Sequence, residues 1–188
     1  MSIYTINSET ELAGGSVADA DELVIYDADA AVTKKVAMDS IRQFVGGGLV
    51  TVLASDALTA AEHAGRTTVF GVLTGATLTL PAATGTGDIY KIGVALTVTS
   101  NDYIVQVANA TDEFLGTLLQ TDTDTTDTLA SYPCLDGDGF DTITMNGTTK
   151  GGLLGDSIVL VDIAAGMWQI SGHINGNGTV ATPFSAGV

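Results

Sequence analysis

Few residues in this sequence have the types and spacing that catalysis requires. The 188-residue chain has two histidines, His63 and His173, and a single cysteine, Cys134. A nucleophilic thiol needs a base and an orienting group, and no third group accompanies Cys134 and a histidine. The sequence also lacks zinc-binding, serine-hydrolase and phosphate-loop motifs. We therefore expect no enzyme and no cofactor, a buried or half-buried thiol at Cys134, and a strand-surface position for His173.

One acidic stretch could bind a metal ion. Residues 136–141 read Asp-Gly-Asp-Gly-Phe-Asp, and alternating acids and glycines can offer hard oxygen ligands to Ca²⁺. The stretch lacks the spacing of an EF-hand loop and its closing glutamate. A tight acidic turn between two strands is therefore the preferred interpretation. If a calcium site exists, Asp136, Asp138 and Asp141 would be its ligands; no other metal is expected.

The charge balance limits the partners of the chain. It has 22 acidic residues against 6 basic ones, and a formal net charge of −16. Phosphate binding requires a basic surface, so DNA and anionic membranes are poor partners. Apolar residues make up 45% of the chain, which is enough for a core. The start of the sequence has neither the basic segment nor the apolar segment of a signal peptide, so we expect synthesis in a cytoplasm without export.

The first 48 residues predict a small module of their own. Residues 1–20 are polar and acidic and predict an extended arm. Two β-rich runs, residues 22–27 and 33–37, predict a hairpin, and residues 41–45 predict a short helix with one apolar face. The triple glycine that ends at Gly48 predicts a domain boundary. We therefore divide the chain into an N-terminal module, residues 1–48, and a second domain, residues 49–188.

The sequence of the second domain predicts an all-β fold of about eight to ten short strands. A jelly-roll-like β-sandwich or barrel, preceded by the hairpin and short-helix arm, is the expected architecture. Residues 157–163 form the most apolar run and predict a central strand. Residues 120–128 predict an exposed loop, and residues 176–188 a flexible tail with a possible anchor at Phe184. The remaining predicted strands are residues 49–53, 89–98, 103–108, 114–119, 141–145 and 167–174.

Two segments in the middle of the chain carry the clearest local pattern. Residues 67–73 and 76–80 are typical of strands, residues 76–80 alternate small or polar residues with apolar ones, and Thr74 and Gly75 separate the two runs. Pro81 stops the second run because proline donates no ladder hydrogen bond. This pattern predicts a β-hairpin. The preceding residues, 56–63, fit either a helical turn capped by Ser55 or Asp56 or a strand followed by a loop.

Two stretches resemble proteins encoded by tailed bacteriophages. Residues 20–30, followed by Lys34-Lys35-Val36 and Asp39-Ser40-Ile41, are similar to a segment near the N-terminus of phage fibre and head-associated proteins. The second stretch resembles phage virion proteins described as structural or capsid-decoration proteins; it comprises residues 58–66, 80–88, 146–149, 151–156 and 168–184. The resemblance implies a virion structural role, usually as a homotrimer, and implies no catalytic residues.

From this resemblance we expect a decoration or cement protein that binds the major capsid protein on the outside of the capsid of a virion. The N-terminal module would mediate anchoring or contacts between subunits. Its apolar residues are the first candidates for that interface, and they would otherwise form the local core of the module: Leu23, Val24, Ile25, Tyr26, Ile41 and Phe44.

The alternative is a tail-fibre or head-fibre adhesin that binds a host glycan. Glycan sites often place aromatic side chains over the sugar faces, beside carboxylates. Tyr132 and Trp168 are the suggestive aromatics, although packing in the core explains Trp168 better.

Overall fold

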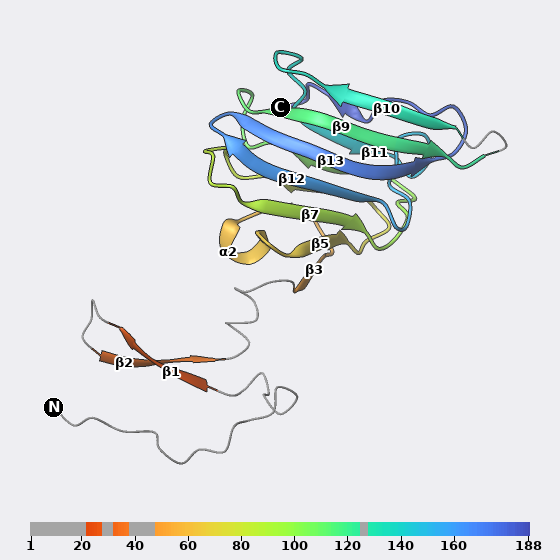
Figure 1. The fold of residues 1–188 in the computed structure, drawn as a ribbon. Helices are drawn as coiled ribbons and strands as arrows, with labels where there is room; N and C mark the ends of the chain where they lie inside the picture. The colour runs from red at the N-terminus through yellow and green to blue at the C-terminus, as the bar shows by residue number, and fades with distance from the viewer. Residues whose placement is uncertain (1–21, 28–31, 38–47, 125–127) are drawn as a thin grey trace. The chain divides into compact units, whose positions relative to one another are not determined.

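The computed structural model describes residues 22–27, 32–37, 48–124 and 128–188 (Figure 1). The chain forms two compact units, Met1–Gly46 and Gly47–Val188. In the first unit, β1 (Glu22–Asp27) pairs antiparallel with β2 (Val32–Ala37). The predicted N-terminal hairpin is thus confirmed. The predicted extended arm of residues 1–20 and the helix of residues 41–45 lie outside the described residues.

The second unit is a β-sandwich of two mixed sheets. The larger sheet faces the viewer in Figure 1 and has the strand order β10-β9-β13-β12-β7-β5-β3. Its strands are β3 (Leu49–Val52), β5 (Thr67–Phe70), β7 (Ile89–Val94), β9 (Glu113–Asp122), β10 (Leu129–Cys134), β12 (Ser157–Ala164) and β13 (Met167–Gly176). β12 is the middle strand of the seven, which confirms the central position predicted for residues 157–163.

The smaller sheet has five strands in the order β14-β11-β8-β6-β4. They are β4 (Asp56–Ala57), β6 (Ala76–Thr79), β8 (Tyr103–Gln106), β11 (Thr142–Met145) and β14 (Phe184–Ser185). Within the described residues of this unit, helix is limited to α2 (Ala60–His63), which Thr59 caps by accepting a hydrogen bond from the Glu62 N–H. Residues 56–63 thus form a short strand and then a helical turn, and the cap of that turn is Thr59 rather than Ser55 or Asp56.

From β3 to β8 the chain changes sheet after every strand. β3, β5 and β7 run parallel in the large sheet, while β4, β6 and β8 run parallel in the small one. The hairpin predicted for residues 67–80 is therefore wrong, because β5 and β6 lie in opposite sheets. A turn at Thr74 and Gly75 exists, with Gly75 at φ +77°. Local alternation shows that each strand has a buried face, but it does not show which strand lies alongside it.

One further prediction for the second unit is corrected, and one is confirmed. Residues 120–128 are not simply an exposed loop, since β9 continues to Asp122 and both Gln120 and Asp122 are buried. The sequence did not predict β10, which is an edge strand, a position that tolerates Pro133. The anchor expected at Phe184 in the tail is confirmed, because β14 pairs with β11 and Phe184 is buried.

The core fills the space between the two sheets. Phe70 from the large sheet stacks on Tyr103 from the small sheet, with ring centroids 4.2 Å apart and an interplanar angle of 13°. The Tyr103 hydroxyl donates to the carbonyl oxygens of Val72 and Leu96. Trp168 and Tyr90 meet edge to face at 5.5 Å. These aromatic contacts join strands that are distant in sequence.

Replacement of Phe70 tests the importance of the contact between the sheets. Phe70→Ala removes a fully buried ring and leaves a cavity beside Tyr103. We expect the free energy of unfolding to fall by about 3–5 kcal/mol, as measured by urea denaturation. Val69→Ala is the matched control, because the neighbouring Val69 is half-buried on the opposite face of β5 and should cost about 1 kcal/mol or less. Equal losses in the two variants would contradict this account of the core.

Candidate assembly surface

The outward face of the large sheet is unusually apolar for a surface. On β12, Ile158, Leu160 and Asp162 are buried toward the core, so Val159 and Val161 point to the other side, where they are half-buried. The same outward row continues to Ile163, which is exposed. A strand that is apolar on both faces is typical of a sheet that is covered on both sides. Within residues 48–124 and 128–188, no element covers this face.

Strand register extends the surface across all seven strands. Leu49, Thr67, Lys91, Val159, Ser171, Thr117 and Pro133 follow one another across the sheet. We call the outward residues of this sheet the neutral face: Leu49, Thr51, Thr67, Val69, Ile89, Lys91, Leu115, Thr117, Leu119, Thr121, Leu129, Ser131, Pro133, Ser157, Val159, Val161, Ile163, Gln169, Ser171 and His173. Its exposed large apolar side chains are Leu49, Ile89, Leu119, Leu129 and Ile163.

Charge is almost absent from the neutral face. Residues 47–188 contain 14 acidic residues and three basic ones, Arg66, Lys91 and Lys150, yet the neutral face holds Lys91 as its one charged residue, and Glu113, which points outward from the first position of β9, adds a single carboxylate at its margin. Glu113 begins β9 at the margin of the face, and its carboxylate accepts from the N–H groups of Gly137 and Gly139. The acids therefore occupy loops, the rim and buried positions, which leaves a flat surface without electrostatic repulsion.

Several buried acids hold the loops that connect the strands. The Asp162 carboxylate accepts hydrogen bonds from the N–H groups of Thr84, Gly85 and Thr86 and from the Thr86 hydroxyl. Burial alone would raise the pKa of Asp162, but these hydrogen bonds outweigh it and lower the pKa below its usual value. The loop between β6 and β7 is thus folded around an internal anion, as backbone N–H groups do in anion-binding nests.

Asp156 holds a second loop, but its pKa is shifted in the opposite direction to that of Asp162. Its carboxylate accepts from the N–H groups of Gly152, Leu153 and Asn175 and from the Asn175 side chain, with distances of 2.7–3.1 Å. Burial raises the pKa of Asp156 above its usual value, and these hydrogen bonds oppose the rise without cancelling it. Asp156 therefore joins the loop before β12 to the end of β13.

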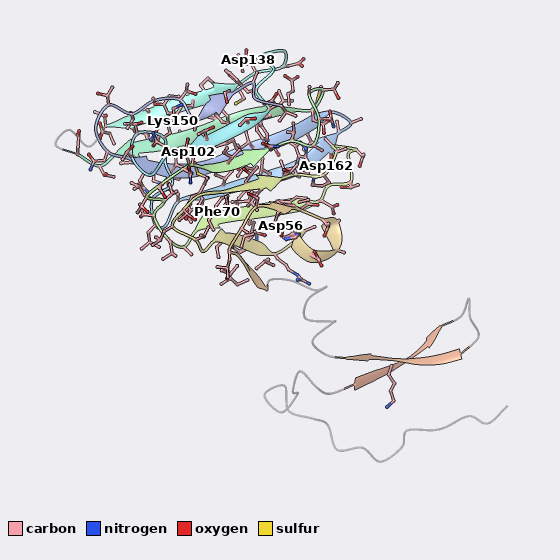
Figure 2. All side chains as sticks on the ribbon, turned by 180° about the vertical axis from the view of Figure 1, so that it is seen from behind. Asp56, Phe70, Asp102, Asp138, Lys150 and Asp162 are labelled. Atoms are coloured by element: carbon pink, nitrogen blue, oxygen red, sulfur yellow. The ribbon has the colours of Figure 1, made fainter. Side chains whose placement is uncertain are left out.

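The predicted calcium ligands have separate roles. Asp138 accepts from the Leu135 N–H, while Asp141 is buried and accepts from the Thr142 hydroxyl and from the N–H groups of Gly187 and Val188. Asp136 is exposed. In the described part of the chain, no three histidine, cysteine or acidic side chains form a group that could hold a metal ion. The labelled aspartates in Figure 2 are likewise spread over the domain.

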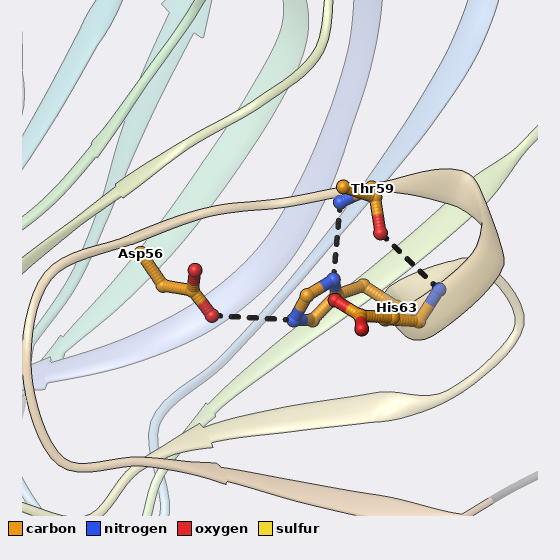
Figure 3. Close-up of polar contacts among 4 residues, drawn as sticks. Asp56, Thr59 and His63 are labelled. Carbon is orange, nitrogen blue, oxygen red and sulfur yellow. Dashed lines mark hydrogen bonds and ion pairs between the residues drawn. The ribbon is translucent and has the colours of Figure 1, made fainter.

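His63 is the most enclosed of the potential bases. The Thr59 N–H donates to its Nδ1 at 3.0 Å, and its Nε2 lies 3.6 Å from Oδ2 of Asp56 (Figure 3). A nitrogen that accepts from an N–H carries no proton, so the neutral ring has its proton on Nε2, facing Asp56. Both ring nitrogens face groups of the same chain, and the ring is buried. This geometry secures the β4–α2 segment and leaves no ring nitrogen for a substrate.

Cys134 and His173 occupy the positions that the sequence predicts. Cys134 is buried, and burial, followed by the nearby Asp138 and Glu113, raises the pKa of its thiol to about 12. A thiol with so high a pKa is a poor nucleophile near neutral pH. His173 is exposed on β13, and its Nε2 lies 2.7 Å from the Thr121 hydroxyl. The two residues are 39 positions apart in sequence.

The aromatic residues considered for a glycan site are not displayed together. Trp168 is fully buried and packs on Tyr90, which confirms its core position. Tyr132 is half-buried and packs against the core from β10. Trp168 therefore offers no open face for stacking on a sugar.

The interface residues expected in the N-terminal module are only partly placed. Leu23, Val24, Ile25 and Tyr26 lie on β1, opposite Val36, Lys35, Lys34 and Thr33. Ile41 and Phe44 lie outside the described residues. The sequence interpretation missed the neutral face. In residues 157–163, apolar side chains occupy both odd-numbered and even-numbered positions, and this pattern is typical of a strand that is covered on both sides.

Comparison with protein-family models, with curated proteins and with solved structures found no match. In addition, no helix among the described residues has the length and apolar character needed to cross a membrane.

Asp162→Asn tests whether the internal carboxylate holds the loop of residues 84–86. An amide would turn an N–H donor toward backbone donors, so we expect a loss of about 2–3 kcal/mol near neutral pH. Because the folded pKa of Asp162 is lowered, its stabilisation is present above the unfolded value of about 3.9 and is lost as the pH falls through the folded pKa. The difference in unfolding free energy between wild type and variant should shrink toward acid, as measured by urea unfolding at a series of pH values.

Asp156→Asn is the matched control, because folding raises the pKa of Asp156 whereas it lowers the pKa of Asp162. The folded pKa of Asp156 is raised, so this carboxyl stabilises most at low pH, and the contribution falls as the pH rises from the unfolded value through the folded one. The difference from wild type should therefore widen toward acid. If the difference in unfolding free energy from wild type changes with pH in the same direction for both variants, the opposite pKa shifts assigned to these two carboxyls are wrong.

Proposed function

We propose that this chain is a structural protein of a tailed-bacteriophage virion. It decorates the outside of the capsid by binding the major capsid protein, and it has no enzymatic activity. The observation that carries the proposal is the neutral face, a broad and almost uncharged sheet surface on a strongly acidic domain. A surface of this kind suits attachment to another protein over a large flat area, where exposed apolar side chains contribute most.

The distribution of polar chemistry supports an assembly role. The buried carboxylates accept hydrogen bonds from loop N–H groups, His63 faces Thr59 and Asp56, and the Cys134 thiol is buried. These groups stabilise a rigid scaffold. The sheet then presents many weak contacts, and repetition over a shell makes weak contacts effective.

The finer features belong to the same proposal. We infer a homotrimer from the resemblance to phage decoration proteins, and we place residues 1–48 in anchoring, with Leu23, Val24, Ile25 and Tyr26 as contact residues. A jelly-roll-like connectivity is part of the same expectation. Support for the anchoring role comes from β1 and β2, because a two-stranded hairpin alone is marginally stable in water and gains stability from a partner.

Binding to undecorated capsid shells tests the proposed function. Val161→Glu places a charge at the centre of the neutral face, and we expect it to weaken binding by about tenfold or more, since about 1.4 kcal/mol is sufficient for that change. The full-length protein would be mixed with shells of the encoding phage and measured by co-sedimentation over a range of concentrations. Ile104→Glu is the matched control, because Ile104 is half-buried on β8, in the other sheet.

Three outcomes decide between the interpretations. Weaker binding by Val161→Glu alone supports attachment through the neutral face. If both variants bind shells as well as wild type, the neutral face is not the contact surface. If deletion of residues 1–48 then abolishes shell binding, the N-terminal module is the anchor. If the wild-type protein does not bind shells but binds a glycan on an array, the capsid-decoration hypothesis is wrong and the adhesin hypothesis is supported.

A further inference from the structure

One edge of the large sheet has no further strand beside it within residues 48–124 and 128–188. Among the described strands, β3 pairs with β5 alone, so its other side is a sheet edge. Leu49 and Leu53 beside that edge have 67% and 68% of their surface exposed. Natural sheet edges usually carry a charge, a proline or a bulge that prevents pairing with another chain. β10, at the opposite edge, contains Pro133, whereas residues 49–53 contain no such device.

The hydrogen bonds between β3 and β5 show which peptide groups of this edge point away from β5. The Thr67 N–H donates to the Gly48 carbonyl, and the Gly71 N–H donates to the Val52 carbonyl. Peptide groups of a strand point alternately to its two sides. The groups of Gly48, Val50 and Val52 therefore face β5, and those of Leu49 and Thr51 face away from the sheet.

The sequence of this edge reads the same in both directions. Residues 49–53 are Leu-Val-Thr-Val-Leu, with Thr51 at the centre. An antiparallel pair of two such segments, related by a two-fold axis, would place Thr51 opposite Thr51 and Leu49 opposite Leu53 of the second copy. Leu53 directly follows the end of β3 at Val52, so this pairing would extend each strand by one residue. The exposed leucines would then form cross-strand apolar pairs, which stabilise a sheet.

We propose that β3 pairs with β3 of a second copy of this chain, antiparallel and centred on Thr51. The outward peptide groups of Leu49 and Thr51 fit this register, because the two residues that meet at Thr51 exchange both of their backbone hydrogen bonds. The contact joins two large sheets edge to edge. It follows from the β3 edge alone and does not depend on binding to a capsid.

The absence of charge in residues 49–53 favours this segment as a contact between two copies. Each copy carries a net charge of −16, so two copies repel each other, and the repulsion is reduced where the contact contains no acid. Residues 49–53 are uncharged, while Asp56 and Glu62 follow nearby in the sequence. Added salt screens the flanking acids, so the association should strengthen with ionic strength.

A two-fold contact has a particular use if the homotrimer of the proposed function exists. Two-fold contacts between three-fold oligomers produce an extended network, which is the geometry required to cover a shell. This consequence rests on the proposed function, whereas the pairing itself requires only two copies of the chain.

Charge exchange at Thr51 tests the pairing with the full-length protein. Thr51→Lys and Thr51→Glu each place like charges directly opposite in a homotypic pair, which destabilises it. We expect each variant alone to lose the concentration-dependent doubling of mass that wild type shows in light scattering. An equimolar mixture of the two should recover it, because opposite charges then meet. Recovery on mixing also shows that neither variant had simply failed to fold.

A cysteine cross-link gives the position of the axis. In such a pair the two Thr51 Cα atoms would lie about 5.5 Å apart, within the span of a disulfide. Thr51→Cys, with the buried Cys134 replaced by serine, should give covalent dimers on mild oxidation. Ser100→Cys in the same background is the control, since Ser100 is exposed and distant from β3 in sequence. Equal cross-linking of the two cysteines, or identical masses of wild type and Thr51→Lys at all concentrations, would overturn the proposal.

Discussion

The layer of side chains between the two sheets holds the second unit together, and Phe70 and Tyr103 stack at its centre. Because the chain changes sheet after each strand from β3 to β8, this layer is filled from both sides by residues that are distant in sequence. Strands in one sheet therefore acquire their neighbours only when the other sheet is in place. The parallel pairs β3–β5 and β4–β6 follow from this winding, since two parallel strands cannot be joined by a tight hairpin.

Alternate crossing between sheets produces long loops, and buried acids stabilise them. Asp162, Asp156 and Asp141 each accept several hydrogen bonds from backbone N–H groups that no strand pairs. Unpaired N–H groups would be costly inside the protein, and a carboxylate can satisfy two or three at once. Part of the acidity of the chain is thus structural. The remainder lies at loops and rims and leaves the neutral face without carboxylates.

The two surfaces proposed for assembly share a physical basis. The neutral face and the β3 edge are both regions of low charge on an acidic molecule, and both present groups that the described part of a single copy does not pair or cover. The face leaves apolar side chains without a covering layer, and the edge leaves peptide groups without partners. Association with other proteins would complete each of them, through side-chain burial on the face and backbone hydrogen bonds at the edge.

The sequence by itself determined the all-β class, the N-terminal hairpin, the central strand around residues 157–163 and the buried state of Cys134 and Trp168. These features follow from local alternation, apolar runs and the scarcity of helix signals, which each segment carries in its own residues. Only the tertiary structure decided that β5 and β6 lie in opposite sheets, that Asp141 binds backbone N–H groups of the C-terminal residues, and that the largely uncharged outward side chains of seven strands form one face. The physical reason is that alternation specifies which side of a strand is buried, whereas its partner depends on contacts between residues far apart in the chain.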